Sequence, residues 1–226
     1  MFDAVLPLLQ PYRGLTGPPP AVVRLWGEGS RGIWIDNSWG PAVPYPPVDH
    51  ADGARNHGYM RTKRDVAAIR RIPEVADFPA LGELLTSINA LGSPIESVGC
   101  EKALTPSTTV PGATVLLGSY VDVIFTDASL NDAPENALLL ACHLASAIDG
   151  CEKWWADVSM VLQRMRFLAG TSLPWGLMMQ IKNYGRTEDE ARKCWAETAK
   201  RLAKAVAALP QDFRWSEAQA AAGGLL

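Results

Sequence analysis

The sequence lacks the features that mark membrane, secreted and zinc-binding proteins. Its 226 residues contain no run of 18 or more apolar residues, so we expect no transmembrane helix. The N-terminal stretch MFDAVLPLLQPYRG lacks the basic start and long apolar core of a secretory signal. The four cysteines include no CxxC pair, and no His/Cys cluster has zinc spacing. We therefore expect a soluble, cytoplasmic protein with reduced thiols and no contact with a membrane.

The chain also lacks the short motifs of several common enzyme classes. It contains no G-x-S-x-G, no G-x-x-x-x-G-K-[ST], no H-E-x-x-H and no G-x-G-x-x-G after a predicted strand. The glycine-rich WGEGSRG (26–32) has no phosphate-loop lysine, and we interpret it as a hairpin turn. These absences disfavour P-loop NTPases, zinc peptidases, Rossmann dehydrogenases and nucleophile-elbow hydrolases.

Charge is distributed unevenly along the chain, although the net charge is only −3. Residues 55–71 hold 6 basic side chains and 1 acidic one, whereas 72–160 hold 2 basic and 12 acidic. This pattern favours internal charge complementarity, or a basic-faced partner on the acidic part. It has no broad positive stripe, so we do not expect a duplex nucleic acid as partner.

Local signals predict the order of helices and strands. Two β-rich segments, 21–26 and 32–37, form a predicted hairpin, and alternation predicts strands at 95–104 and 113–127. Capping residues and apolar periodicity predict helices at 62–72, 78–91, 134–148, 154–168, 172–185 and from Thr187 onward.

Because strands cluster with strands and helices with helices, the sequence predicts an α+β fold rather than β-α-β alternation. We expect a single domain over 1–226, with a small antiparallel sheet made of the N-terminal hairpin and a central two-stranded unit. A mainly helical C-terminal layer should cover that sheet. Residues 1–20, which contain GPPP, should form an irregular arm, and 41–59 a long Pro/Gly-rich loop.

Asp122 is the first candidate for a catalytic acid or base. It lies in the middle of a predicted strand that is apolar on both faces, VLLGSYVDVIF (115–125). A carboxylate in such a strand is unfavourable unless it is paired, so either a basic side chain meets it or the strand opens onto a cleft. A carboxyl in a cleft acquires a perturbed pKa, which is how enzymes make acids and bases.

The end of the same strand, VIFTDASLND, resembles the first strand of RNase H-like domains in reverse transcriptases. The resemblance covers about ten residues and implies a two-metal nuclease site, with Asp127 as first carboxylate and Glu135 as second. Glu135 follows after only eight residues, where the family has two further strands. The alternative is that Asp127 ends the strand and Asp132 caps the next helix.

The long loop holds two of the three histidines. His50 and Asp52 form an H-x-D pair that resembles the ligands of the iron and 2-oxoglutarate oxygenases, with His143 as the distal histidine. His143 lies in an apolar helical run, where a core histidine is the alternative. His57 is the nearer third ligand, so His50, Asp52 and His57 are the candidate site for a divalent metal. No other cofactor can be named.

Aromatic and basic residues gather around 41–71, in a chain with eight tryptophans. The predicted aromatic anchors are Trp39, Tyr45 and Tyr59, and the predicted basic contacts are Arg61, Lys63, Arg64, Arg70 and Arg71. We expect a binding or accessory protein that uses this surface to contact an anionic partner, either a protein or a small molecule. The alternatives are core packing for the aromatic residues and a solvated helix face for the basic ones.

A second class of function remains open. In it the protein is a hydrolase of a phosphate-bearing substrate, metal-dependent or not, with Asp122 and Asp127 at its centre. The sequence also leaves homo-oligomerisation open.

Overall fold

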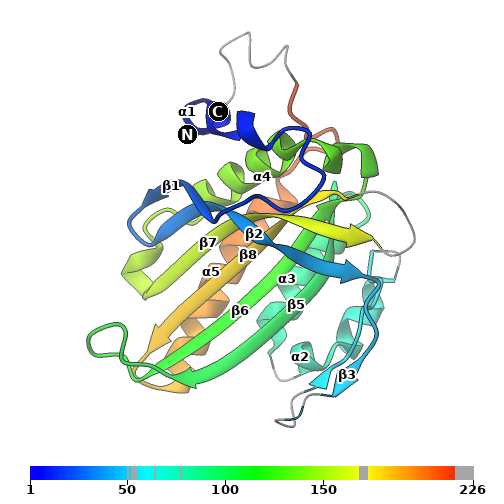
Figure 1. The fold of residues 1–226 in the computed structure, drawn as a ribbon. Helices are drawn as coiled ribbons and strands as arrows, with labels where there is room; N and C mark the ends of the chain where they lie inside the picture. Colours follow the sequence, from blue (N-terminus) through cyan, green and yellow to red (C-terminus); the bar gives the residue numbers. More distant parts are fainter. Residues whose placement is uncertain (50, 52–54, 64, 77, 168–172, 217–226) are drawn as a thin grey trace.

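Figure 1 shows the computed structural model of the protein, which describes residues 1–49, 51, 55–63, 65–76, 78–167 and 173–216. At its centre lies a six-stranded mixed sheet in the order β1-β2-β7-β8-β6-β5, and β3 and β4 form a separate two-stranded sheet. The strands are β1 (Val23–Glu28), β2 (Arg31–Val43), β3 (Val48–Asp49), β4 (Arg55–Asn56), β5 (Ile95–Pro106), β6 (Val115–Phe125), β7 (Ala156–Phe167) and β8 (Trp175–Gly185).

The helices are short at the N-terminus and longer toward the C-terminus. The α-helices are α1 (Phe2–Val5), α2 (Pro73–Ala76), α3 (Pro79–Asn89), α4 (Pro134–Ala147) and α5 (Glu188–Ala207). The 3-10 helices are η1 (Leu6–Tyr12), η2 (Val66–Arg71), η3 (Ala128–Asp132) and η4 (Cys151–Trp154). No helix in the described part of the chain is both long and apolar enough to cross a membrane.

Several local predictions are confirmed. The hairpin forms as β1 and β2, and the two central strands form as β5 and β6. The last helix begins where its capping box predicts, because the Thr187 hydroxyl accepts a 3.2 Å hydrogen bond from the Glu190 backbone N–H. Part of the expected irregular arm is helical, as α1 and η1, and the expected helix at 62–72 is the 3-10 helix η2.

The predicted fold class is wrong in the size and composition of its sheet. The chain is α+β, but its main sheet has six strands and is mixed, since β2 runs parallel to β7 while every other neighbouring pair is antiparallel. The two segments predicted as helices at 154–168 and 172–185 are instead β7 and β8, the two central strands. The apolar residues of the first segment, Val158, Val161 and Met165, recur at intervals of three and four, which also fits a helix, so local spacing alone did not identify the strand.

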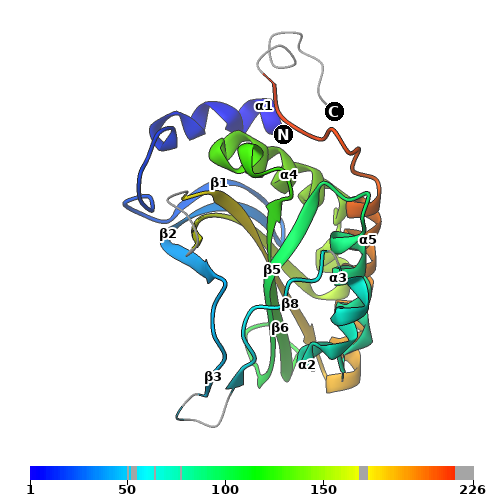
Figure 2. The same ribbon diagram turned by 90° about the vertical axis from the view of Figure 1, so that its right-hand side faces the viewer.

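Helices cover one face of the sheet. Turned by 90°, the molecule shows α3 and α5 along one side of the strands, with α1 and α4 at one end (Figure 2). The side chain of Trp195 on α5 is fully buried, and its indole N–H donates a 2.6 Å hydrogen bond to the Ser119 hydroxyl of β6. This contact joins the helical layer to the sheet and accounts for one of the eight tryptophans as core packing.

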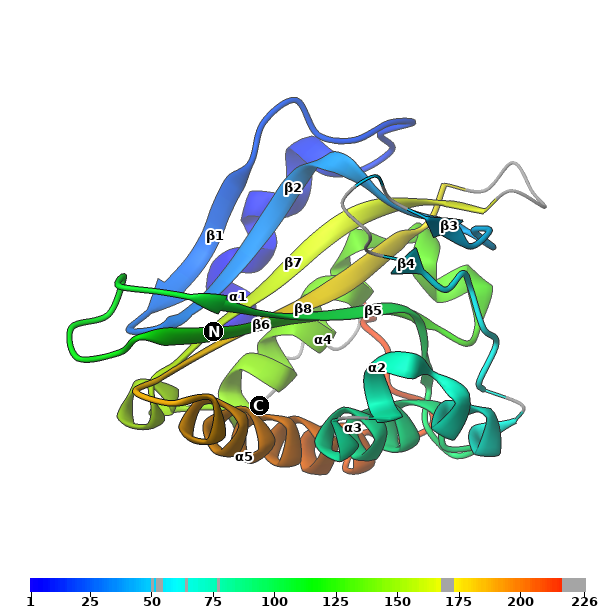
Figure 3. The same ribbon diagram turned by 90° about the horizontal axis from the view of Figure 1, so that it is seen from below.

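The opposite face of the sheet carries none of the described helices. From below, α3 and α5 lie side by side under the sheet, while β1 and β2 curve away from the other strands (Figure 3). The curvature makes the uncovered face concave. Tyr120 of β6 and Met178 of β8 alternate onto this face and are partly exposed on it.

Candidate functional site

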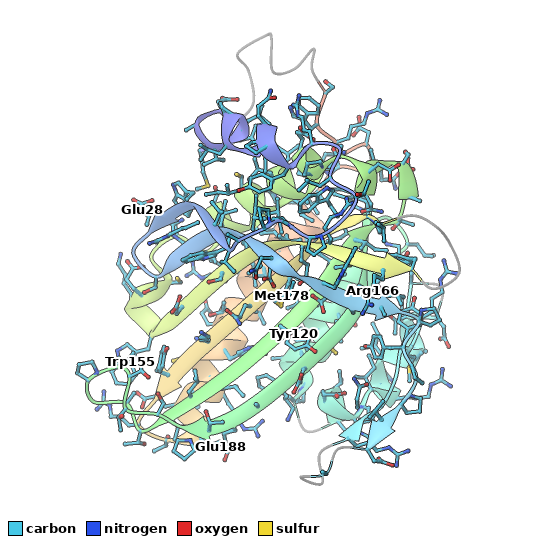
Figure 4. The ribbon with its side chains drawn as sticks, viewed as in Figure 1. Glu28, Tyr120, Trp155, Arg166, Met178 and Glu188 are labelled. Carbon is cyan, nitrogen blue, oxygen red and sulfur yellow. The ribbon has the colours of Figure 1, made fainter. Side chains whose placement is uncertain are left out.

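A cleft of about 550 Å³ lies on the open face of the sheet. Figure 4 shows Tyr120 and Met178, two of its lining residues, near the middle of that face. Its walls come from β2, the segment after it, β4, α2 and the four strands β5 to β8. Its lining includes Asp36, Trp39, Gly40, Tyr45, Arg55, Glu74, Gly99, Cys100, Glu101, Tyr120, Asp122, Gln163 and Met178.

Asp122 lies at the base of this cleft. The alternation of β6 places Val121 and Val123 in the core and turns Asp122 to the open face, although its side chain is only 3% exposed. Its Oδ1 accepts a 2.6 Å hydrogen bond from the Gln163 side-chain N–H of β7. Among the described residues, no ion pair joins Asp122 to a basic side chain. The buried carboxyl thus has one neutral partner and no cation.

Burial determines the protonation of Asp122. Loss of solvent raises its pKa from the ordinary 3.8 to about 7, because the charged form is disfavoured in a low-dielectric site, and the hydrogen bond from Gln163 opposes that rise. At neutral pH the group is therefore divided between its protonated and ionised forms. A group in that state responds strongly to any charge that enters the cleft.

Two glycines make room for the Asp122 and Gln163 side chains. A Cβ on Gly99 would lie 2.9 Å from Oδ2 of Asp122 and 3.6 Å from the Tyr45 hydroxyl, and a Cβ on Gly40 would lie 2.8 Å from Gln163. Both glycines adjoin register irregularities, one in β5 between Ser97 and Gly99 and the other in β2. Such bulges re-aim side chains and are common beside binding sites.

The tyrosine and cysteine side chains next to Asp122 stay neutral. Burial raises the pKa of the Tyr45 hydroxyl and that of the Cys100 thiol to about 12. Burial also raises the pKa of Tyr120, and a hydrogen bond with Glu101 raises it further. These groups supply hydroxyl oxygens and ring faces, while Cys100 is no nucleophile because its thiolate is inaccessible at neutral pH.

The charge of the cleft is negative. Asp36, Glu74, Glu101 and Asp122 contribute carboxyl groups, and the basic side chain among the lining residues is Arg55. Arg55 is already engaged, because its Nε lies 3.3 Å from a carboxylate oxygen of Asp49. The cleft therefore attracts cations and repels anions.

Several predicted site residues meet in this cleft. Asp122, Trp39 and Tyr45 all line it, although they come from β6, β2 and the segment after β2. Tyr59 lies just behind, with its ring 6.1 Å from that of Tyr45 in an edge-to-face arrangement. The Arg166 guanidinium stacks 5.7 Å from the Trp39 ring centre. The aromatic residues around the long loop thus form part of one site.

Asp127 lies apart from the cleft, at the exposed N-terminus of η3. The Ser129 backbone N–H and hydroxyl donate to its Oδ1 at 3.0 and 2.7 Å, and these hydrogen bonds lower the pKa of Asp127. Its role in the structure is to cap η3. Glu135, the second carboxylate of the RNase H-like interpretation, is buried on α4 and forms an ion pair with Arg13. The structure does not bring these two carboxylates into one site with Asp122.

The predicted basic contacts differ in their surroundings. Lys63 is buried, and its ammonium donates to the carbonyl oxygens of Ala90, Ser93 and Ile95 at 2.8, 2.6 and 2.8 Å. Arg71 is exposed and pairs with Asp65 at 3.1 Å. Arg61 and Arg70 are exposed, whereas Arg64 lies outside the described residues.

The predicted metal ligands cannot be assembled into a site. His50 and Asp52 lie outside the described residues, and His57 is exposed. His143 lies on α4, where its Nε2 is 3.0 Å from the Ala205 carbonyl oxygen and its ring contacts Phe213. Among the described residues no group of three or more His, Cys, Asp or Glu side chains is placed to hold a metal ion.

The sequence did not reveal Gln163, Met178, Glu101, Gly40 or Gly99 as site residues. Gln163 and Met178 lie on β7 and β8, which were expected to be helices. The local signal for Gln163 is a polar pair, Gln163 and Arg164, between the apolar residues of VLQRM (161–165). The two glycines are recognisable only from the space that neighbouring side chains occupy.

No protein-family model, curated protein or solved structure matches this chain. The function must therefore be inferred from the geometry and charge of the cleft.

Proposed function

We propose that this is a binding protein that takes up a cationic group in the cleft on the open face of its sheet. The observation that carries the proposal is the buried carboxyl of Asp122, which faces a negatively charged cleft and has no cationic partner among the described residues. A buried carboxylate is strongly stabilised by a cation placed against it. A ligand that brings such a cation gains most of its affinity there.

The aromatic lining supports the same class of ligand. Trp39, Tyr45 and Tyr120 contribute rings to the cleft, and ring faces attract cations by about 0.5–2 kcal/mol each. The volume of about 550 Å³ lies within the range of small-molecule sites and holds one long basic side chain with room to spare. An acidic, aromatic cleft is therefore suited to an amine or guanidine, free or on a protein partner.

The expectation of an anionic partner remains a proposal for a different part of the surface. Of the basic residues between 55 and 71, Arg61 and Arg70 are exposed on the outside of the molecule, whereas Lys63 is engaged by three carbonyl oxygens. The cleft has the opposite charge. A reducing, cytoplasmic location also remains part of the proposal, and it is supported by four unpaired cysteines.

A matched series of four-carbon ligands tests the cationic preference. Butylguanidinium and butylammonium should shift the NMR signals of the Trp39 indole N–H and the Gln163 side-chain amide, whereas butanol and butyrate should not. The double variant Asp122→Asn, Glu101→Gln should lose the response. Glu83→Gln, an exposed acid on α3 outside the cleft, is the matched control and should keep it. Equal shifts with butyrate would refute the proposal.

A second candidate function is general acid–base catalysis by Asp122, the enzyme alternative that the sequence left open. Its supporting observation is the burial of the Asp122 carboxyl at the base of a cleft, which raises its pKa to about 7 and suits it to donate or accept a proton at neutral pH. The charge of the cleft favours a neutral or cationic ester or amide over a phosphate-bearing substrate. Hydrolysis of cationic p-nitrophenyl esters that titrates near pH 7 and is lost in Asp122→Asn would establish it. A pure binding protein shows no turnover above that variant.

A further inference from the structure

We infer that the cationic group is a guanidinium, and that it enters the cleft in exchange for the proton of Asp122. This inference rests on the proposed binding function and specifies both the chemical class of the ligand and the regulation of the site. It combines three features of the cleft: the depth of the carboxyl, the spread of its hydrogen-bond acceptors and the aromatic walls.

The depth of Asp122 selects against strongly hydrated cations. With 3% of its side chain exposed, the carboxyl can be reached only by a cation that has shed most of its water. An ammonium is a compact, strongly hydrated charge, whereas a guanidinium is planar, delocalised and more weakly hydrated. The guanidinium therefore loses less free energy on desolvation at this depth.

The acceptors in the cleft are dispersed over several elements. Oδ2 of Asp122 and the Tyr45 hydroxyl lie on the same side, beside Gly99. Glu101 on β5 and Glu74 on α2 add carboxylate oxygens at other positions in the wall. The five N–H donors of a guanidinium point outward in a fixed plane and can serve separated acceptors at once, which the three donors of an ammonium do less well.

The chain itself stacks a guanidinium on a ring at the rim of the cleft. Arg166 lies 5.7 Å from the centre of the Trp39 ring. Elsewhere on the same sheet Arg24 lies over Trp34 at 5.3 Å and Arg164 over Trp175 at 5.0 Å. These pairs show the geometry that a ligand guanidinium would adopt on Tyr45 or Tyr120.

The exchange of charge follows from what surrounds Asp122. Facing it are Tyr45 after β2, Cys100 and Glu101 on β5, Tyr120 on β6, Gln163 on β7 and Glu74 on α2, while Asp36 and Arg55 complete the charged lining. The pKa values of the two tyrosines and of the thiol are raised, so these groups are neutral and cannot supply the compensating charge. In the free protein a bound proton neutralises the Asp122 carboxyl, because burial raises its pKa to about 7.

The reaction is balanced without a further reactant. The neutral carboxylic acid of Asp122 releases its proton to solvent, and the guanidinium pairs with the carboxylate that remains. Below the pKa of Asp122 in the free protein, each bound guanidinium releases close to one proton. The affinity for guanidinium therefore falls about tenfold for each unit by which the pH is lowered. Above that pKa the carboxylate is already ionised, and affinity no longer depends on this group. The cleft therefore captures its ligand at neutral pH and releases it on acidification.

Calorimetry with capped amino acids tests both the preference for a guanidinium and its exchange with the proton of Asp122. N-acetyl-arginine amide, N-acetyl-lysine amide and the neutral N-acetyl-citrulline amide are titrated into the full chain between pH 5.5 and 8.5, in two buffers of different ionisation enthalpy. The arginine derivative should bind at least about tenfold more tightly than the lysine derivative, and citrulline should not bind. Proton release should approach one per ligand at pH 5.5 and vanish at pH 8.5.

The variant Asp122→Asn separates Asp122 from the other carboxyls in the cleft. It keeps the size of the side chain and the oxygen that accepts from Gln163, and it should bind arginine weakly, with no proton release. If this variant fails to fold, Asp122→Ser, which removes the carboxyl and keeps a small polar side chain, serves the same purpose. Undiminished proton release in either variant would overturn the assignment to Asp122.

The outcomes distinguish this inference from the proposed function. Lysine binding as tightly as arginine would overturn the guanidinium assignment, and arginine binding without proton release would overturn the exchange, while a cation-binding cleft would stand in both cases. Failure of every cation to bind would refute the proposed function as well. A further arm compares capped arginine with the same residue inside a Gly/Ser heptapeptide. Tighter binding of the peptide indicates an arginine on a protein partner, and equal binding indicates a small guanidino compound.

Discussion

The Gln163 side-chain amide donates a 2.6 Å hydrogen bond to Oδ1 of Asp122 across the intervening strand β8. The two residues are 41 positions apart in the chain and belong to strands that pair with β8 but not with each other. In the sheet register Gln163 is paired with Gly176 of β8, and the side chain of Met165 fills the space above that glycine. This contact holds the carboxyl in the base of the cleft.

The first prediction concerns stability and pH in Asp122→Asn. Because the folded pKa of Asp122, about 7, exceeds the ordinary 3.8, the folded state binds this proton more tightly than the unfolded chain. The contribution of protonated Asp122 to the free energy of unfolding is complete below about pH 4. It is lost at about 1.4 kcal/mol per pH unit as the pH rises to about 7. The variant lacks this loss and should be more stable than the wild type at pH 8, by up to about 4 kcal/mol.

Urea unfolding of both proteins at pH 5, 6.5 and 8 measures the difference, and the other carboxyl groups cancel because both proteins share them. A difference that does not grow between pH 5 and pH 8 would show that Asp122 is ionised in the folded protein at pH 5.

The second prediction concerns the space beside Oδ2. Gly99→Ala should displace the Asp122 carboxyl, weaken guanidinium binding at least about tenfold and cost about 1–2 kcal/mol of stability by overpacking. Gly118→Ala on the neighbouring strand β6 is the matched control, because its Cβ would meet no atom closer than the Ala103 carbonyl oxygen at 4.0 Å. Calorimetry and urea unfolding measure both variants. Equal binding by the two would mean that Gly99 does not shape the site.

The third prediction concerns the donor to Asp122. Gln163→Met keeps a long buried side chain but removes the hydrogen bond that opposes the rise in the pKa of Asp122. The pKa should therefore rise further, and the pH at which guanidinium affinity levels off should move upward by about one unit. Gln180→Met, on β8 outside the cleft lining, should leave the profile unchanged. A profile that moves downward in Gln163→Met would contradict the role of this hydrogen bond.

The fourth prediction separates structural from surface basic residues. Lys63→Met leaves three buried carbonyl oxygens without their donor and should cost about 3 kcal/mol of stability. Arg61→Met, at an exposed position two residues earlier, should change stability by less than about 0.5 kcal/mol. Thermal unfolding of the two variants measures the contrast. Similar melting temperatures would show that the Lys63 contacts contribute little.

Local chemistry in the sequence determined a large part of this protein. The cap of Thr187 on α5, the turn between β1 and β2 and the alternation of β6 depend on residues close in the chain, and each element forms as predicted. The same reasoning selected Asp122, because a carboxyl in an apolar strand is unfavourable wherever the strand lies.

The tertiary structure alone decided what Asp122 does. The apolar residues of β7 and β8 also fit the spacing of a helix, and only the pairing of these segments in the middle of the sheet decides between the two. Their placement brings Gln163 to Asp122, and the bulges in β2 and β5 bring Trp39, Tyr45 and Gly99 to the same cleft. Whether Asp122 meets a base, a neutral amide or open space depends on residues far away in the chain. Burial and pairing, and with them the pKa of Asp122, are therefore properties of the folded protein.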